Sequence, residues 1–305
     1  MEFQLDPYLK KKSINGWPLF WLISAPLSIG MIVAIANADL STGKGISSLI
    51  QLSVRCAVPL LYTAFLASSA HALFSSDLTA WILRNRKYLG LCFAVGMAWQ
   101  AVFIIWMVGA YTDYYANEVF VLRDLIEGLL GYIVLLPMVL TTFKFGRRLI
   151  TRKQWRLLHK TGIYYLWAYA FSVYWWEIFY YRDPVFLDYA FYWAGLLAWG
   201  LRAAAWTKAR RYSIGKSSAG APLHRLAGPL GLAVASIGVA AASFGSAWIQ
   251  PSQEILYGYA LTRIPEALLP YWPFEPFLPL LVIGVGCLLI GNSDDWKNRT
   301  NASRA

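Results

Sequence analysis

The chain has 305 residues, of which 58% are apolar and only 14% carry a charge, and its mean hydropathy is positive at +0.46. About a quarter of the residues of a soluble domain are usually charged, so this composition excludes a water-soluble globule and an intrinsically disordered chain. The formal net charge of +11 would indicate a nucleic-acid partner in a soluble protein, so the positions of the basic residues matter.

Eight stretches of about 20 mostly apolar residues follow one another, and each is long enough to cross a bilayer as a helix. The sequence therefore predicts an all-α fold, a polytopic membrane helix bundle of about eight transmembrane helices. An even number of spans places both termini on one side. The stretches are Trp17–Ala36, Cys56–Phe74, Tyr88–Tyr111, Glu127–Phe143, Thr161–Tyr181, Pro184–Ala203, Leu226–Ile249 and Phe274–Gly291.

Basic residues gather in the loops that share a side with the N-terminus, which holds 22 of the 27. Cytoplasmic loops carry an excess of Lys and Arg, so we expect an inner-membrane protein with both termini cytoplasmic. The basic excess then indicates topology, with the lipid bilayer as partner, and no nucleic acid is needed to explain it. The basic residues on the opposite side are Lys44, Arg55, Arg123, Arg182 and Arg263.

Composition divides the chain into three parts. Residues 1–212 hold six spans, residues 213–225 are rich in Ser, Gly and Ala and are predicted to be a cytoplasmic linker, and residues 226–305 hold two spans and a short tail. The seventh span carries small residues at helical spacing, which predicts a close-packing face. These residues are Gly231, Ala235, Gly238 and Ala242.

Two polar residues lie deep in the predicted spans. Gln100 lies twelve residues beyond Tyr88 at the start of the third helix, and Ser172 lies twelve residues beyond Lys160, just before the fifth. Each offset is a rise of roughly 18 Å. They are therefore predicted to lie at the same depth. We expect Gln100 to hydrogen-bond to another helix, with a catalytic role as the alternative. The aromatic run 164–176 around Ser172 is predicted to pack the core, with flanking of a cofactor as the alternative.

Three runs in order along the chain resemble the ferric-reductase-like transmembrane domain family. They are Arg84–Leu91 before the third helix, Tyr132–Thr142 in the fourth and Trp155–Lys160 before the fifth. This family includes the haem-binding membrane subunits of the bacterial methionine sulfoxide reductase system and, more distantly, the NADPH oxidases. The resemblance covers the first six spans, about two thirds of the chain. It implies a six-helix core that carries electrons through b-type haem.

The resemblance also implies where haem ligands would lie. The family's histidines of the third and fifth helices correspond to Gln100 and Ser172, so one complete haem site is replaced here. His159 at the start of the fifth helix remains. His71 could face it and form an iron site at the inner surface, because imidazole is the usual haem ligand. The alternative is that His159 is an interfacial or capping residue.

Three functions compete. One is electron transfer, as a membrane oxidoreductase subunit that needs a separate donor or acceptor protein, because no phosphate-binding glycine loop indicates a flavin or nicotinamide site in this chain. Another is a non-redox accessory subunit that docks a partner protein through its last two helices. The third, a transporter or lipid-modifying enzyme, would need intramembrane charges or a broken helix pair, and the sequence predicts neither.

Overall fold

The structure is a computed structural model, and it describes residues 6–180, 183–216, 226–259 and 275–293. Helices make up 88% of these residues and none lies in a strand, which confirms the all-α class. The elements are α1 (Asp6–Leu9), η1 (Lys12–Ile14), α2 (Trp17–Asn37), α3 (Gly43–Leu73), α4 (Asp77–Ala110), α5 (Thr112–Tyr114), η2 (Tyr115–Val119), α6 (Leu122–Leu140), α7 (Lys144–Arg147), α8 (Arg152–Phe179), α9 (Phe186–Lys216), α10 (Ala227–Ser243), α11 (Gly245–Tyr259), η3 (Glu275–Phe277) and α12 (Leu278–Gly291).

The chain forms two compact units, and each is described here by itself. Unit 1 comprises the described residues of 1–174 and 185–198, and unit 2 those of 175–184 and 199–305. Helix α9 continues to Lys216, so the first four residues of the expected linker, 213–216, are helical. The remainder of that linker, 217–225, lies outside the described residues.

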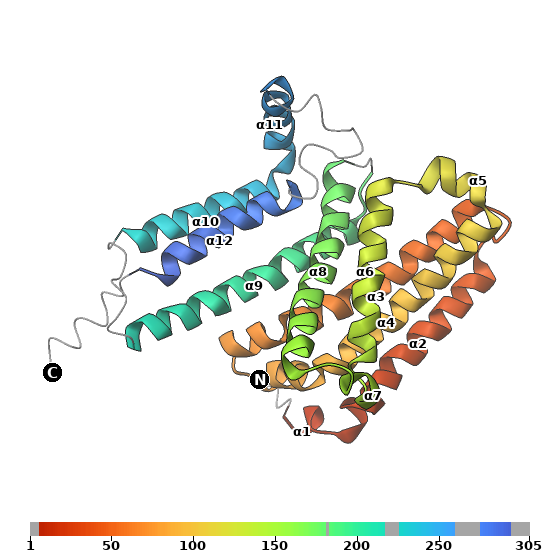
Figure 1. Cartoon of the computed structure of the whole chain (residues 1–305), viewed down its shortest axis with the longest axis horizontal. Helices are drawn as coiled ribbons and strands as arrows, with labels where there is room; N and C mark the ends of the chain where they lie inside the picture. The colour runs from red at the N-terminus through yellow and green to blue at the C-terminus, as the bar shows by residue number, and fades with distance from the viewer. Residues whose placement is uncertain (1–5, 181–182, 217–225, 260–274, 294–305) are drawn as a thin grey trace. The chain divides into compact units, whose positions relative to one another are not determined.

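Unit 1 is built from helices that alternate in direction. In Figure 1, α2 rises from the end that carries α1, α3 returns and α4 rises again toward α5, while α6 descends to α7 and α8 rises. Helices α3 and α4 pack against each other along an extensive contact. A Cβ at Gly96 on α4 would lie 2.8 Å from the Cβ of Ala57 on α3. This glycine therefore allows the two backbones to approach closely.

Local polar groups determine where the helices of unit 1 begin. Thr42 caps α3 by accepting a hydrogen bond from a backbone N–H of the first turn at 3.2 Å. Ser76 and Thr79 cap the start of α4 reciprocally, at 3.3 and 3.1 Å. Helix α2 follows Gly16, whose φ of +71° favours glycine. The Gly16 N–H donates to the buried Asn85 at 3.0 Å, which ties the start of α2 to α4.

Three described helices, α2, α3 and α4, are long and apolar enough to cross a membrane. Leu22, Ile29 and Ile32 on α2 are each more than half exposed, as expected for side chains that contact lipid. The bent pair α10 and α11 could form a fourth span, and α12 is shorter. These helices are consistent with a membrane protein, but the predicted count of eight spans is not confirmed.

The predicted seventh span is wrong as a single straight helix. It breaks at Phe244, and α10 and the following segment Gly245–Pro251 are bent by 87°. A Cβ at Gly245 would lie 2.8 Å from the ring of Phe179, so this glycine makes room for the ring at the bend. The Trp248 indole N–H donates to the Ala241 carbonyl at 2.9 Å. This hydrogen bond across the break gives the carbonyl a partner.

The small residues of α10 do form a close-packing face, as predicted, and their partner is α12. Gly231, Gly238 and Ala242 are buried. A Cβ at Gly231 would lie 2.7 Å from the carbonyl oxygen of Gly286, and one at Gly238 would lie 2.8 Å from the backbone nitrogen of Ile283. The two helices therefore pack backbone to backbone along this face.

Replacing Gly238 by Leu is expected to force α10 away from α12, because even a Cβ would lie 2.6 Å from Ile283 Cγ1. Overpacking of this kind costs about 1–3 kcal/mol. Thermal unfolding in detergent measures the loss. Gly30→Leu on α2 is the matched control, because a Cβ at Gly30 has no neighbour within 4 Å. Equal melting temperatures for the two variants would contradict the packing.

Candidate functional site

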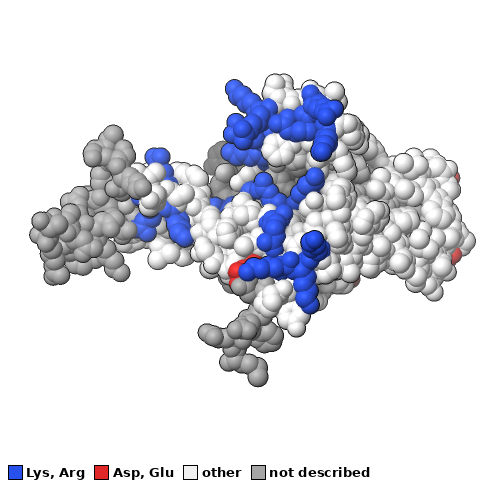
Figure 2. All heavy atoms as spheres, turned by 90° about the horizontal axis from the view of Figure 1, so that it is seen from below, with Lys and Arg blue, Asp and Glu red and all other residues white. Residues whose placement is uncertain are grey.

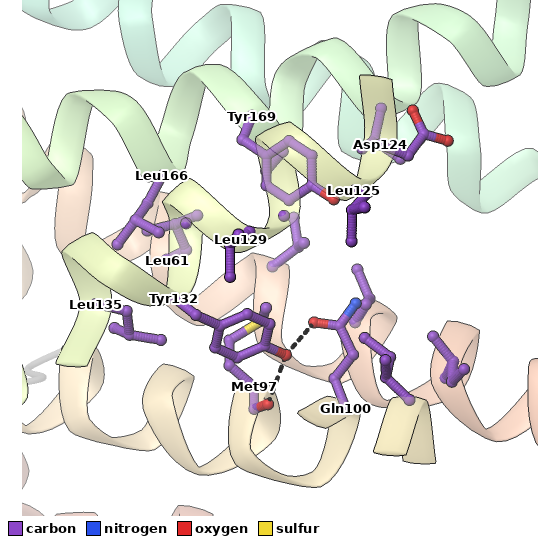
Figure 3. Close-up of a pocket in the computed structure, with 18 of the residues that line it drawn as sticks. Leu61, Met97, Gln100, Asp124, Leu125, Leu129, Tyr132, Leu135, Leu166 and Tyr169 are labelled. Carbon is purple, nitrogen blue, oxygen red and sulfur yellow. Dashed lines mark hydrogen bonds between the residues drawn. The ribbon is translucent and has the colours of Figure 1, made fainter. Parts of the chain in front are cut away.

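Unit 1 contains a cavity of about 420 Å³ bounded by α3, α4, α6 and α8, with the η2 segment at one end. Apolar side chains make up most of its lining. Its polar side chains are Gln100, Tyr115, Asp124, Tyr132, Tyr169 and Tyr174. Figure 3 shows Gln100 from α4, Tyr132 from α6 and Tyr169 from α8 all directed into this space.

Gln100 hydrogen-bonds across the cavity to another helix, as the sequence predicts. The hydroxyl of Tyr132 on α6 lies 2.9 Å from Gln100 Oε1 and 3.0 Å from the carbonyl oxygen of Met97, so it is shared between two acceptors on α4 (Figure 3). An unpaired amide in an apolar bundle is costly, and this bond satisfies its acceptor. Among the described residues, Gln100 Nε2 has no hydrogen-bond partner.

Ser172 does not join Gln100 at the cavity. It is buried, with 2% of its surface exposed, but it is not part of the cavity lining. Of the rings near it on α8, Tyr169 and Tyr174 line the cavity, whereas Trp167 and Phe171 are not in the lining. Phe65, Trp167, Phe171 and Tyr192 form a stacked series with centroid distances of 5.2, 5.4 and 5.2 Å. For these rings the packing interpretation of the aromatic run is confirmed.

His159 lies at the start of α8, where its Nε2 is 3.1 Å from the hydroxyl of Thr141 and its ring is 4.6 Å from that of Trp155. Burial lowers the pKa of His159 below its ordinary value of 6.5, and the positive charges of Arg86 and Arg147 lower it further. The imidazole is therefore neutral near pH 7. These contacts favour the structural interpretation of His159.

His71 lies near the end of α3, and its Nδ1 is 3.2 Å from the hydroxyl of Thr79. Within the described part of the chain, His71 makes no hydrogen bond or ring contact with His159. Each histidine therefore has a threonine hydroxyl as its hydrogen-bond partner, and the iron site at the inner surface stays a prediction.

The cavity residues do not fit the b-type haem that the resemblance implies. Among the described residues, no histidine lines the cavity, so these residues do not supply the imidazole pair that such a haem would use. Two thioethers, Met97 and Met107, are in the lining, but they lie ten residues apart on α4, or roughly 15 Å along one helix. They cannot ligate opposite faces of one iron.

The run Arg84–Leu91, which contributes to the resemblance, begins with residues that anchor the N-terminal segment. Arg84 donates hydrogen bonds to Asn15 and to the carbonyl of Leu9, both at 3.0 Å. Asn85 donates to Asn15 as well, at 2.8 Å. These contacts give the run a role in fixing the start of the chain on α4.

Sequence reasoning missed three polar groups of the cavity and one in unit 2. Tyr115, Asp124 and Tyr132 line the cavity, but only their position against Gln100 reveals this. Tyr169 and Tyr174, which also line it, belong to the aromatic run for which flanking of a cofactor is the alternative. In unit 2, Glu275 at the start of η3 is completely buried and accepts a hydrogen bond from Tyr180. Because Glu275 lies at the edge of a predicted span, its burial could not be predicted from the sequence.

Comparisons with known protein families, with curated proteins and with solved structures found no match for this chain. The site is therefore interpreted from its own residues.

Changing Tyr132 to Phe is expected to lower the free energy of unfolding by about 1 kcal/mol, because it leaves the Gln100 carbonyl without its donor. Adding Gln100→Leu to that variant should recover part of the loss, because no amide then remains unpaired. A double-mutant cycle on thermal unfolding in detergent measures the coupling. Additive effects of the two substitutions would contradict a direct bond.

Acidification is expected to destabilise the protein through His159. Because its folded-state pKa lies below 6.5, the folded form binds fewer protons, and stability decreases as pH falls below that value. His159→Gln keeps a hydrogen-bonding group near Thr141 but cannot titrate. Its melting temperature should therefore fall less than that of the wild type between pH 7.5 and pH 5. Identical pH profiles would show that His159 is not the titrating group.

Proposed function

We propose that this chain is a membrane protein that binds an apolar molecule in the cavity of unit 1. The observation that carries the proposal is the cavity itself, which combines a largely apolar lining with a few polar groups directed inward. Its volume of about 420 Å³ falls within the range of roughly 300–1,000 Å³ typical of small-molecule sites.

The wall formed by α6 supports entry from the lipid. Leu125 and Leu129 line the cavity, yet 45% and 57% of their surfaces are also exposed. These side chains therefore separate the cavity from the outside by a single layer. A ligand already dissolved in the bilayer could pass between α6 and its neighbours by rotamer changes of these two leucines.

We further propose that the protein spans an inner membrane eight times with both termini cytoplasmic. Within unit 1, α1, α7 and the start of α8 lie at one end (Figure 1). Lys11 follows α1 closely, α7 carries Lys144 and Arg147, and α8 begins at Arg152. Figure 2 shows Lys and Arg gathered on the face seen from below, where Asp and Glu are scarce. This distribution supports a cytoplasmic position for that end.

Electron transfer is the second candidate, because the three runs that resemble the ferric-reductase-like family lie in order along the chain. The replaced ligand positions count against it. The accessory role, with a membrane or soluble redox protein as partner, is compatible with ligand binding and needs no haem. The bent pair of α10 and α11 supplies the broken helix that the transporter hypothesis lacked.

Binding in the cavity can be tested with adamantane diazirine, an apolar reagent that crosslinks to nearby residues on illumination. We expect it to label peptides of α4, α6 and α8 that line the cavity. Gly131→Leu should abolish most of this labelling, because a Cβ there has its nearest neighbour at 3.8 Å and the larger side chain then extends into the space. Mass spectrometry of the digested protein locates the label.

The matched control is Gly109→Leu on α4, where a Cβ has no neighbour within 4 Å and which does not line the cavity. This variant should be labelled like the wild type. Label confined to exposed apolar faces such as that of α2, with no difference between the two variants, would refute the proposal.

Absorption spectroscopy tests electron transfer independently. The purified protein, oxidised and then reduced with dithionite, is expected to show no bands of a six-coordinate b-type haem, because the cavity offers no pair of imidazoles. Sharp reduced bands in stoichiometric amount would instead establish electron transfer and a ligand set elsewhere in the chain.

A further inference from the structure

We infer that the ligand of this cavity is an uncharged amphiphile with a hydroxyl head, bound with its head between α4, α6 and α8 and its apolar chain toward the cytoplasmic end of unit 1. The inference rests on the proposed function and specifies its ligand. It is argued from the polar groups of the lining, from their charge and from their distribution along the cavity.

The polar groups of the lining include donors and an acceptor that the protein leaves available. Gln100 Nε2 and the Tyr169 hydroxyl have no hydrogen-bond partners among the described residues, and Figure 3 shows both directed into the cavity. Asp124 adds a carboxylate acceptor at the same end. A hydroxyl both donates and accepts, so it can satisfy an acceptor and a donor together.

The charges around the cavity disfavour a ligand with an ionised head group. Asp124 is the only acidic residue in the lining, which contains no Lys, Arg or His. A carboxylate or phosphate head would therefore meet the Asp124 carboxylate without a cation in the described lining to bind it. A cationic head would compete with Arg123, whose Nε already lies 2.8 Å from Asp124 Oδ1 with little of its side chain exposed. An uncharged head avoids both costs.

The distribution of polar and apolar residues along the lining indicates how the ligand is oriented in the cavity. Along α6 the lining runs from Asp124 to Leu135, eleven residues or about 16 Å. The end around Leu135 also contains Leu61, Phe93 and Leu166, all of them apolar and buried. An extended chain therefore fits with its head near Asp124 and its tail among these side chains.

The test is competition against adamantane diazirine labelling of the cavity by amphiphiles that differ only in their heads. We expect 1-decanol to compete at lower concentration than decane, decanoate or decyltrimethylammonium. Tyr169→Phe should weaken the competition by decanol about fivefold, which is the effect of one lost hydrogen bond. The competition by decane should not change. Tyr189→Phe on α9 is the matched control, because that side chain is 43% exposed and does not line the cavity.

Asp124→Asn tests the charge argument on its own. This variant should admit decanoate more readily than the wild type does, because the repelling carboxylate is gone and Arg123 remains. Unchanged exclusion of decanoate would overturn that step.

A further competition experiment with 1,2-dioctanoylglycerol distinguishes two sources of the hydroxyl head. Competition by this glyceride indicates a membrane glycerolipid, and competition by decanol alone indicates a single-chain alcohol; either result supports a hydroxyl head. If decane competes as well as decanol in the wild type, the inference fails while the proposed function stands. If cavity labelling is absent from the start, the proposed function itself fails.

Discussion

The hydrogen bond between the Tyr132 hydroxyl and the Gln100 carbonyl holds α6 against α4, and the form of the cavity depends on it. Helix α6 presents many exposed leucines on one side and packs closely on α8 on another, where a Cβ at Gly162 would lie 2.9 Å from Val134 Cγ1. A second tyrosine acts from the other side, since Tyr165 on α8 donates to the carbonyl of Glu127 on α6 at 2.9 Å. Two hydroxyls thus attach one helix to both neighbours, and the space left between them is the cavity. In an apolar surrounding such bonds also orient the helices, because each polar group has few alternatives.

Sequence patterns with a local cause were sufficient to predict the helical class, the need of Gln100 for a partner on another helix and the small-residue face of α10. The break at Phe244 could not be predicted in this way, because Gly, Ala and Ser recur evenly on both sides of it and the bend depends on Phe179, which is distant in sequence. The cavity could likewise not be predicted from the sequence. Asp124, Gln100 and Tyr169 lie far apart along the chain, and no spacing rule relates them.

The residues at the haem-ligand positions implied by the resemblance have different surroundings in the structure. Gln100 faces the cavity with a tyrosine as its partner, whereas Ser172 is buried and does not line the cavity. The two histidines nearest the expected inner surface are each engaged by a threonine. At the positions where the resemblance implies haem ligands, the side chains therefore have hydrogen-bond or packing roles in unit 1.

Native mass spectrometry of the protein released directly from membrane vesicles tests the central claim most directly, because it weighs the ligand that the cell itself supplies. The account predicts one small apolar molecule bound per wild-type chain and none per Gly131→Leu chain, since leucine at that position occupies the cavity. A wild-type chain with the bare polypeptide mass, or the same bound mass in both proteins, would contradict it.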